Sequence, residues 1–300
     1  MIGRVDAARQ VAGDTRAAGD TRTGGDTRTG GDTRTGGHER ADYVFGQDRQ
    51  RSARQHALLA AAHDPVTLQR LAETGVTAGW DALEVGAGGG SVARWLAERV
   101  APSGNVLATD VTELDLPPLP GLRCRVHDVV VDPLPESGFD VVVARLVLRH
   151  LPQRWQVLDK LVRALKPGGW LQVDEFDTSY EPPLLTPDEP SARLYEKFLS
   201  AKESVMLESG VDPKCGRHVP AAMRAAGLED IDPRPHVQLR QPGSPDLELM
   251  SGHARNLRDG LLAAGMTDDE LDQLPMITRD ARFRASSSVM YSVHGRKVHA

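Results

Sequence analysis

Short apolar stretches alternate with helical patterns through the middle of the chain. Strands are expected at residues 80–88, 104–111, 121–130, 138–148 and 170–177, where apolar residues cluster between polar or glycine-rich turns. Residues 91–100 and 152–165 carry apolar positions at helical spacing. Strands that alternate with helices predict a doubly wound α/β fold with a mostly parallel sheet, whose ligands bind beyond the carboxyl ends of the strands.

The segments on either side of this region differ in pattern. Residues 53–73 show helical spacing broken at Pro65, which predicts two helices before the first strand. Between Asp110 and Cys124 the chain is too short and too rich in proline for a full crossover helix. After Tyr180 we expect helices over 193–208, 219–227 and 246–274, one strand at 236–240 and one within 283–297. This half of the chain is expected to form a helical lid together with the last two strands of the sheet.

The N-terminal segment is a low-complexity repeat. Residues 14–37 repeat a six-residue unit, typified by Asp-Thr-Arg-Thr-Gly-Gly, and contain no apolar residue larger than alanine. Such a segment cannot bury enough surface to offset the entropy lost on ordering. We therefore expect a disordered tail over residues 1–40, with order beginning near Tyr43.

Composition narrows the class of protein. The 300 residues carry a formal net charge of −6, which disfavours a nucleic-acid partner because phosphate backbones attract clustered Lys and Arg. The two cysteines, Cys124 and Cys215, form neither a disulfide framework nor a metal-ligand pattern, so no metal is expected. No apolar run has the length of a signal peptide core or a membrane span. A cytoplasmic protein without a membrane partner is expected.

A glycine loop follows the first strand of the core. Gly86-Ala87-Gly88-Gly89-Gly90 joins that strand to a helix, as in loops that hold nucleotides. The third glycine of the dinucleotide motif would fall on Ser91. Glu84, two residues before the loop, suits a ligand with an ammonium group and hydroxyls better than a pyrophosphate. Both features disfavour an NAD-dependent oxidoreductase.

Two further acids stand at the ends of the next two strands. Asp110 ends the second strand, where a carboxylate can accept from both ribose hydroxyls. Asp128 follows the third strand and could accept from an adenine amino group. Val111 and Val129, which follow the two acids, are candidates to sandwich the adenine ring. The loop and the two acids together indicate a nucleoside-containing cofactor.

These motifs resemble those of the class I S-adenosylmethionine-dependent methyltransferases of the small-molecule type common in actinobacteria. "LEVGAGGGSVARWLA", "ATD" and "HDVVVDPLPESGFDVVVARLVLRHLP" are similar to the family's glycine motif, ribose-binding acid, and adenine acid with fourth strand. "LVRALKPGGWLQVDEFD" and "CGRHVPAAMRAAGLEDI" are similar to its fifth-strand region and its late helix and strand, and "YVFGQDRQRSARQ" resembles its N-terminal segment, with Phe45 in place of leucine.

The resemblance implies S-adenosylmethionine as cofactor, S-adenosylhomocysteine as product, and a Rossmann-like seven-stranded sheet with an N-terminal helical segment and a helical lid. It implies helices at 41–78 that close the cofactor site, a core at 79–180, and the lid with the acceptor-binding region at 181–300. The cofactor-binding residues are then expected to be Tyr43, Arg54, Glu84, Gly86, Ala87, Gly88, Asp110, Val111, Asp128, Val129 and Arg145.

The acceptor is expected beside the ends of the fourth and fifth strands. Candidate catalytic residues, acting mainly by positioning, are Arg145, His150 and Glu175; candidates that line the acceptor space are Leu146, Phe176, Tyr180 and His253. Each has a structural alternative: an ion pair for Arg145, a structural hydrogen bond for His150, a solvated strand end for Glu175, and plain surface for His218 and His253. His127 and Asp174 are expected on the opposite faces of their strands.

The favoured function is methylation of a small molecule in specialised metabolism, such as an aromatic or indole-type nucleophile, by in-line displacement. The atom methylated, whether oxygen, nitrogen or carbon, stays open, although the absence of an Asn-Pro-Pro-Tyr motif after the fourth strand disfavours amide and nucleobase N-methylation. The alternatives are an RNA or protein methyltransferase and a non-catalytic cofactor-binding protein. A monomer or a homodimer is expected.

Overall fold

The computed structural model describes residues 49–298, with side chains described from residue 52 onward. These residues belong to one unit that extends from Ala41 to Ala300. The predictions about the repeat at 14–37 and about Tyr43 lie outside the described residues.

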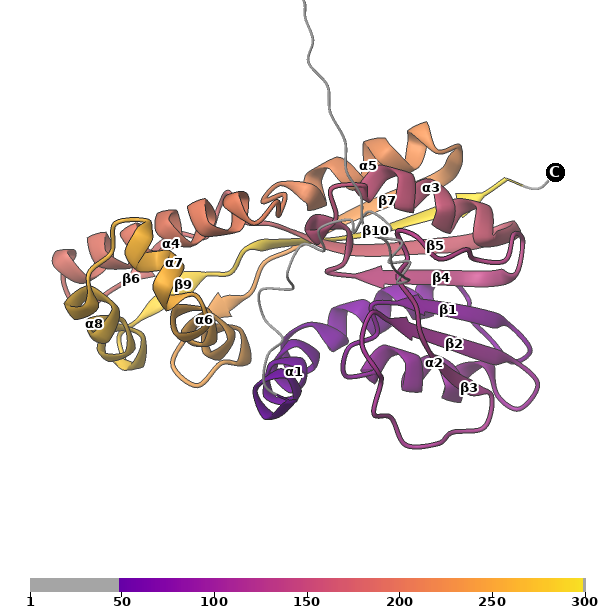
Figure 1. The fold of residues 1–300 in the computed structure, drawn as a ribbon, viewed down its shortest axis with the longest axis horizontal. Coiled ribbons are helices and arrows are strands. Elements are labelled where there is room, and N and C mark those ends of the chain that lie inside the picture. Colours follow the sequence, from indigo (N-terminus) through magenta and orange to yellow (C-terminus); the bar gives the residue numbers. More distant parts are fainter. Residues whose placement is uncertain (1–48, 299–300) are drawn as a thin grey trace, which may run out of the picture. The chain divides into compact units, whose positions relative to one another are not determined.

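The core is a seven-stranded sheet with the order β3-β2-β1-β4-β5-β10-β7 (Figure 1). Five strands run parallel: β3 (Leu122–Val126), β2 (Asn105–Asp110), β1 (Asp81–Val85), β4 (Phe139–Arg145) and β5 (Leu165–Asp177). β10 (Val289–Lys297) pairs antiparallel with both β5 and β7 (Leu228–His236). The predicted mostly parallel, seven-stranded sheet is therefore confirmed.

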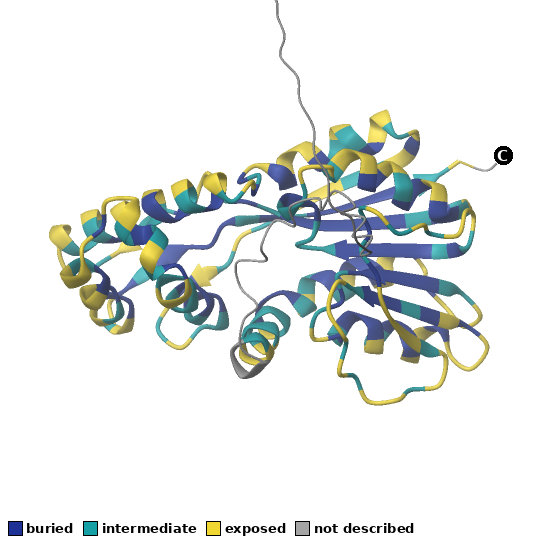
Figure 2. Cartoon of the chain, viewed as in Figure 1, coloured by how far each residue is buried: buried dark blue, intermediate teal, exposed yellow. Residues whose placement is uncertain are grey.

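Helices cover both faces of this sheet. Val141 and Val143 of β4 pack with α1 (Arg49–Glu73) and α2 (Ser91–Val100), while Val142 and Ala144 face α3 (Arg154–Ala164) and α5 (Cys215–Ala225). Figure 2 shows buried strands between helices whose outer faces are exposed. Alternation with a period of two thus decides which side chains reach which layer.

The prediction of two helices broken at Pro65 is wrong. α1 continues through Pro65 to Glu73, although a proline lacks the N–H that the turn before it would accept from. The carbonyl of Ala62, in that preceding turn, accepts a hydrogen bond from the Gln238 side-chain amide at 2.6 Å. This contact ties the turn before the proline to the segment between β7 and β8.

A second, three-stranded sheet was not predicted. It has the order β6-β9-β8, with β6 at Pro183–Leu185, β9 at Arg284–Ser286 and β8 at Leu239–Arg240. Each strand adjoins in sequence one member of the β5-β10-β7 half of the main sheet, so the small sheet continues that half beyond short interruptions (Figure 1). The single strands predicted at 236–240 and within 283–297 are each divided between the two sheets.

Four helices gather around the small sheet: α4 (Glu189–Glu208), α6 (Pro245–Asn256), α7 (Arg258–Ala263) and α8 (Asp268–Arg279). They share an apolar core that includes Tyr195, Phe198 and Phe283. The region predicted to form a helical lid thus contains a layer of helices packed on an extension of the sheet. Within residues 49–298, none of the helices is both long and apolar enough to traverse a bilayer.

The connection after β2 contains no helix, as expected. Residues 111–121 run in extended and turn conformation from β2 to β3. Leu116 of this connection packs against the glycine loop, because a Cβ on Gly90 would lie 2.3 Å from the Leu116 Cδ1. The short segment therefore lies close to the loop and helps to enclose it.

Candidate functional site

The glycine loop lies between β1 and α2, at the carboxyl edge of the parallel strands. Gly86 and Gly88 have φ values of 70° and 51°, in the left-handed region that L side chains rarely adopt. A Cβ on Gly86 would also lie 2.3 Å from the Cγ2 atom of Val147, in the turn after β4. Both the conformation and the close packing against Val147 require glycine at residue 86.

Asp110 is bound directly to this loop. Its Oδ2 accepts from the Gly88 N–H at 3.0 Å, and its Oδ1 accepts from the N–H and the hydroxyl of Thr112 at 3.1 and 3.0 Å. The predicted proximity of Asp110 to the glycine loop is therefore present in the structure. Each carboxylate oxygen has two acceptor sites, so these three contacts leave one site, on Oδ2, for a hydroxyl of a ligand.

Glu84, at the end of β1, is a buried acid without a partner for one of its oxygens. It is 3% exposed, and its Oε2 has no hydrogen bond partner. Burial raises its pKa to about 8, although the nearby Arg145 guanidinium opposes this shift. A buried carboxyl group with a free oxygen fits a ligand that brings its own positive charge or hydrogen-bond donor.

Arg145, at the end of β4, forms an ion pair with Asp64 of α1 at 2.6 Å. Asp64 also accepts from the hydroxyl of Ser91, the first residue of α2, at 3.0 Å. The structural alternative for Arg145 is thus realised, and sequence reasoning missed its partner. The network connects β4, α1 and α2 around the glycine loop.

One face of α1 covers the loop. A Cβ on Gly88 would lie 3.1 Å from the Nε2 of His56, so the imidazole lies over the loop. Burial lowers the pKa of His56, and the Asp110 carboxylate opposes the shift. His56, His63 and Thr67 are spaced seven and four residues apart, which places them on one helix face. This spacing is the signal that could have identified His56 and His63, which sequence reasoning did not single out.

The residues expected around an adenine ring differ in how far they are exposed. Asp128 lies two residues beyond β3, and its Oδ1 accepts from the Val130 N–H at 2.9 Å. Val111 is 57% exposed, whereas Val129 is 4% exposed and packs in the apolar core. The buried position of Val129 gives no support to a ring sandwiched between the two valines, because its side chain is committed to the core.

Glu175 of β5 is fully buried on the face that carries α3 and α5, so the solvated strand end that was its alternative is not what the structure shows. Its Oε1 accepts from the Arg149 N–H at 3.3 Å, and its Oε2 has no hydrogen bond partner. Burial raises its pKa to about 7, although the charge of Arg149 opposes the shift. Asp174 points to the other face and accepts from the Thr67 hydroxyl at 2.6 Å.

Phe176 lies between two polar side chains. Its ring is 5.2 Å from the His63 ring in an edge-on arrangement, and 5.7 Å from the guanidinium carbon of Arg149. Arg149 belongs to the 3₁₀ turn η1 (Leu148–His150) and is 3% exposed. Sequence reasoning missed Arg149, because nothing in the local pattern distinguishes it from a surface arginine.

The remaining candidates are spread over several environments. Leu146 has a φ of 56°, an unusual value for a non-glycine residue and one often found near functional sites. Tyr180 is 60% exposed. Burial lowers the pKa values of His150 and His253 to about 3, which makes both weak bases. Neither histidine is therefore a surface group of ordinary basicity.

The structure also shows the surroundings of three residues outside this network: Arg54, His218 and His127. Arg54 forms an exposed ion pair with Glu248 of α6 at 3.2 Å and so contacts the lid. His218, in contrast, is half exposed, as its structural alternative anticipated, and lies 3.8 Å from Asp212. His127 is buried at 3% exposure, with its Nε2 3.3 Å from the Pro133 carbonyl oxygen.

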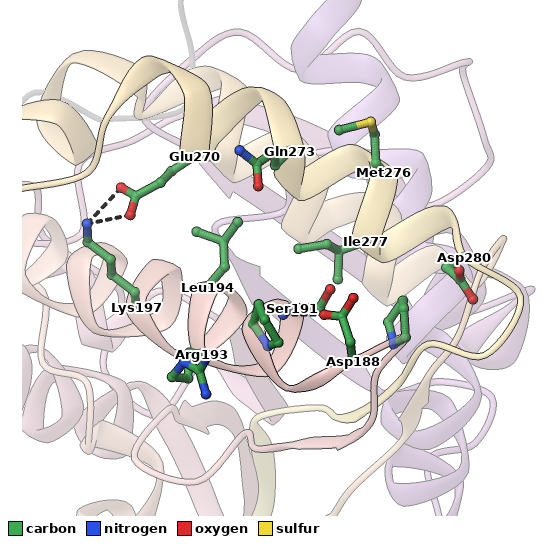
Figure 3. A pocket seen from close by; sticks show the side chains of 12 residues that line it. Asp188, Ser191, Arg193, Leu194, Lys197, Glu270, Gln273, Met276, Ile277 and Asp280 are labelled. Atoms are coloured by element: carbon green, nitrogen blue, oxygen red, sulfur yellow. Dashed lines mark hydrogen bonds and ion pairs between the residues drawn. The ribbon is translucent and has the colours of Figure 1, made fainter.

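Two cavities lie in the lid. The larger, of about 560 Å³, lies between α4 and α8, where Lys197 and Glu270 form an ion pair (Figure 3). The smaller, of about 250 Å³, is lined by Tyr195, Met250 and Arg258 among others. Neither is lined by the glycine loop. Across residues 49–298, no cluster of three or more His, Cys, Asp or Glu side chains is placed to hold a metal ion.

Comparison with known proteins adds independent evidence. Residues 83–173 match a family model described as a methyltransferase domain. Two proteins of Strobilurus tenacellus are similar: Methyltransferase str2, 30% identical over 61% of this chain and 65% of its own length, and Methyltransferase str3, 40% identical over 32% and 35%. A ubiquinone/menaquinone biosynthesis C-methyltransferase of Burkholderia multivorans is 30% identical over 37% of this chain and 49% of its own length. The chain therefore spans less than two thirds of each relative.

Solved structures agree on the fold. The YcgJ protein from Bacillus subtilis superimposes with a TM-score of 0.52 at 15% identity, over 79% of this chain and 100% of that chain. The protein BH2331 from Bacillus halodurans C-125 gives 0.50 at 16% identity, over 78% and 99%. The matched domain, the sheet order and the glycine loop agree, so residues 83–173 of this chain form a methyltransferase domain with the fold of these two structures.

Proposed function

We propose that this protein binds S-adenosylmethionine at the glycine loop and transfers its methyl group to a small-molecule acceptor. The observation that carries the proposal is the arrangement of Glu84, the loop and Asp110 at one edge of the sheet. An orphaned buried carboxyl oxygen, a loop that requires glycine and a carboxylate fixed to that loop form a site suited to an amino acid joined to a nucleoside.

Each part of the cofactor has a chain partner of suitable chemistry. Glu84 Oε2 would accept from its ammonium group, and Asp110 Oδ2 would accept from a ribose hydroxyl. Asp128 would accept from the adenine amino group through Oδ2. Arg145 is already paired with Asp64, so we expect it to position α1 over the loop and not to serve as the main anchor for the cofactor's carboxylate.

When bound, the cofactor supplies a methyl group on a positively charged sulfur, which is a good leaving group. The chain therefore needs chiefly to position the reactants and to exclude water. His56 and the rest of the α1 face cover the loop, and the ion pair of Arg145 with Asp64 holds α1 there. Glu175, with a pKa raised to about 7 by burial, is a better proton acceptor near neutral pH than His150, whose pKa is about 3.

The burial of the acceptor-side groups supports a small molecule as acceptor. Glu175 is 0% exposed and Arg149 is 3% exposed, so a folded RNA or protein surface has little access to them. The similarity to the fungal str2 and str3 methyltransferases supports a role in specialised metabolism. Because another relative is a C-methyltransferase, carbon remains one of the candidate acceptor atoms.

The proposal can be tested by following labelled methyl groups. The full chain would be incubated with S-adenosylmethionine that carries a tritiated methyl group, together with a pool of phenols, indoles, amines and α-keto acids, or with RNA, or with protein. We expect label in the small-molecule pool, and only background with the variant Asp110→Ala. Label that enters RNA or protein, or that enters none of the three, would contradict the proposed function.

A further inference from the structure

The side chain of Arg149 is a buried cation that the described chain does not neutralise. Its Nε and Nη2 atoms are buried and have no hydrogen bond partner, and no ion pair links Arg149 to any described carboxylate. A buried charge without a partner is strongly destabilising, so proteins seldom retain one without a role. Two of its donor atoms are therefore not used by the described chain.

The backbone of Arg149 is held firmly, which separates this case from a loosely placed surface arginine. Its N–H donates to Glu175 Oε1 at 3.3 Å, and its carbonyl accepts from the Asp212 N–H at 2.9 Å. Both contacts fix η1 against β5 and against the segment before α5. The guanidinium is thus presented from a fixed backbone, as a recognition group must be.

The nearby carboxylates have other partners. Glu181 is paired with Lys202 at 2.6 Å and with Arg240 at 2.8 Å, and both partners are buried. Asp212 lies 4.0 Å from Arg154. Glu175 alone remains, and its pKa of about 7, raised by burial, leaves it only partly ionised near neutral pH. The local balance of charge around Arg149 therefore favours an added negative charge.

We infer that Arg149 and Phe176 form the acceptor subsite and that this subsite selects acceptors that carry a carboxylate. The guanidinium would bind the carboxylate through its unpartnered Nε and Nη2 atoms, which form the two-pronged geometry that a carboxylate matches. The Phe176 ring, 5.7 Å from the guanidinium, offers an apolar face to the body of the acceptor. This inference rests on the proposed function and specifies its substrate class.

The test uses matched acids and amides. The full chain, saturated with S-adenosylhomocysteine, would be titrated calorimetrically with benzoate and benzamide, and with indole-3-acetate and indole-3-acetamide. We expect at least one carboxylate to bind tenfold or more tightly than its amide. Arg149→Gln should abolish that preference while the affinity for S-adenosylhomocysteine changes by less than twofold.

A nearby arginine provides the matched control. Arg154 donates to the carbonyls of Leu148 and Gly210 at 3.3 and 3.2 Å, so its guanidinium, unlike that of Arg149, has hydrogen-bond partners within the chain. Arg154→Gln should leave the preference for carboxylates intact. If neither carboxylate is preferred by the wild type, or if the preference survives Arg149→Gln, the inference is wrong. Failure of S-adenosylhomocysteine to bind would instead contradict the proposed function, and the same titrations of the cofactor-free chain would still decide the subsite.

The melting temperature of a second variant tests the inference without a ligand, in case Arg149→Gln does not fold. If Arg149 has no partner within the fold, Arg149→Met, which keeps most of the side-chain volume, should have a melting temperature equal to or higher than that of the wild type. A melting temperature several degrees lower would show that the fold itself uses the charge, and would overturn the inference.

Discussion

Glu84 combines two properties that seldom occur together in a carboxyl group of a stable fold. It is buried to 3% exposure, and one of its oxygens has no partner. In the absence of a ligand, the group avoids most of the cost of a buried charge by staying protonated, as its raised pKa indicates. A cationic ligand group would remove that need, so binding and ionisation at Glu84 should be coupled.

The raised pKa predicts a dependence of stability on pH that can be assigned to this residue. The folded chain keeps a proton on Glu84 up to a pKa of about 8, whereas the unfolded chain loses it near the ordinary value of 4.5. The folded state therefore binds more protons between these values, so the contribution of Glu84 to stability falls as the pH rises from about 4.5 to about 8. Each unit of difference between the folded and unfolded pKa of Glu84 changes the free energy of unfolding by at most about 1.4 kcal/mol.

We therefore expect Glu84→Gln to gain stability relative to the wild type as the pH rises, by several kcal/mol between pH 5 and pH 8, on the order of the shift in pKa. Urea unfolding of both proteins at pH 5, 6.5 and 8 measures this difference. The contributions of the buried histidines cancel because both proteins contain them. Parallel stability curves for the two proteins would show that Glu84 ionises normally in the fold.

At the scale of elements, three chain segments pass between the main sheet and its extension, and a buried charge cluster lies where they meet. Glu181 stands between β5 and β6, Arg240 in β8, and Ser288 between β9 and β10. The carboxylate of Glu181 accepts hydrogen bonds from the side chains of Lys202 of α4, Arg240 and Ser288, at 2.6, 2.8 and 2.7 Å. The cluster is thus placed to fix the extension and its helices to the main sheet.

Removal of the central acid should be costly. Burial alone would raise the pKa of Glu181, but Lys202 and Arg240 outweigh this effect and hold it at about 2. Glu181→Ala leaves the charge of Lys202 without a carboxylate partner and removes one of the two partners of Arg240, and we expect a loss of about 3–5 kcal/mol in the free energy of unfolding. Denaturant unfolding at pH 7 provides the measurement.

An exposed acid on the same part of the chain serves as the control. Glu189 pairs with Arg193 at the start of α4, and its side chain is 82% exposed. Glu189→Ala should change the stability by less than about 1 kcal/mol. If Glu181→Ala proves as mild as this control, the cluster does not fix the extension to the main sheet.

At the scale of the whole molecule, the sequence predicts the half of the fold in which pattern and period are strong. β1, β2, β4 and β5 contain apolar runs bounded by glycine or polar turns, and their parallel orientation follows from their alternation with helices. The position of Asp110 beside Gly88 was predictable for the same reason, since both stand at carboxyl ends of neighbouring strands.

The rest depended on contacts between distant segments. β6, β8 and β9 have three, two and three residues, too few for an alternating pattern to be recognised. α1 runs through Pro65, which the local rule that proline breaks a helix does not predict. Arg149 acquires its character only from burial beside Glu175 and Phe176, which lie about 26 residues further along the chain. Its sequence neighbours give no indication of it.

The central claim is that the glycine loop with Asp110 binds the nucleoside part of the cofactor. Calorimetric titration of the full chain with S-adenosylhomocysteine, and separately with NADH, tests it most directly. We expect micromolar binding of S-adenosylhomocysteine and none of NADH. Asp110→Ala should weaken that binding by about 1–3 kcal/mol, the cost of unpaired hydroxyls, whereas Asp115→Ala, an exposed acid in the same connection, should not. Binding of NADH alone, or an unchanged affinity in Asp110→Ala, would contradict the claim.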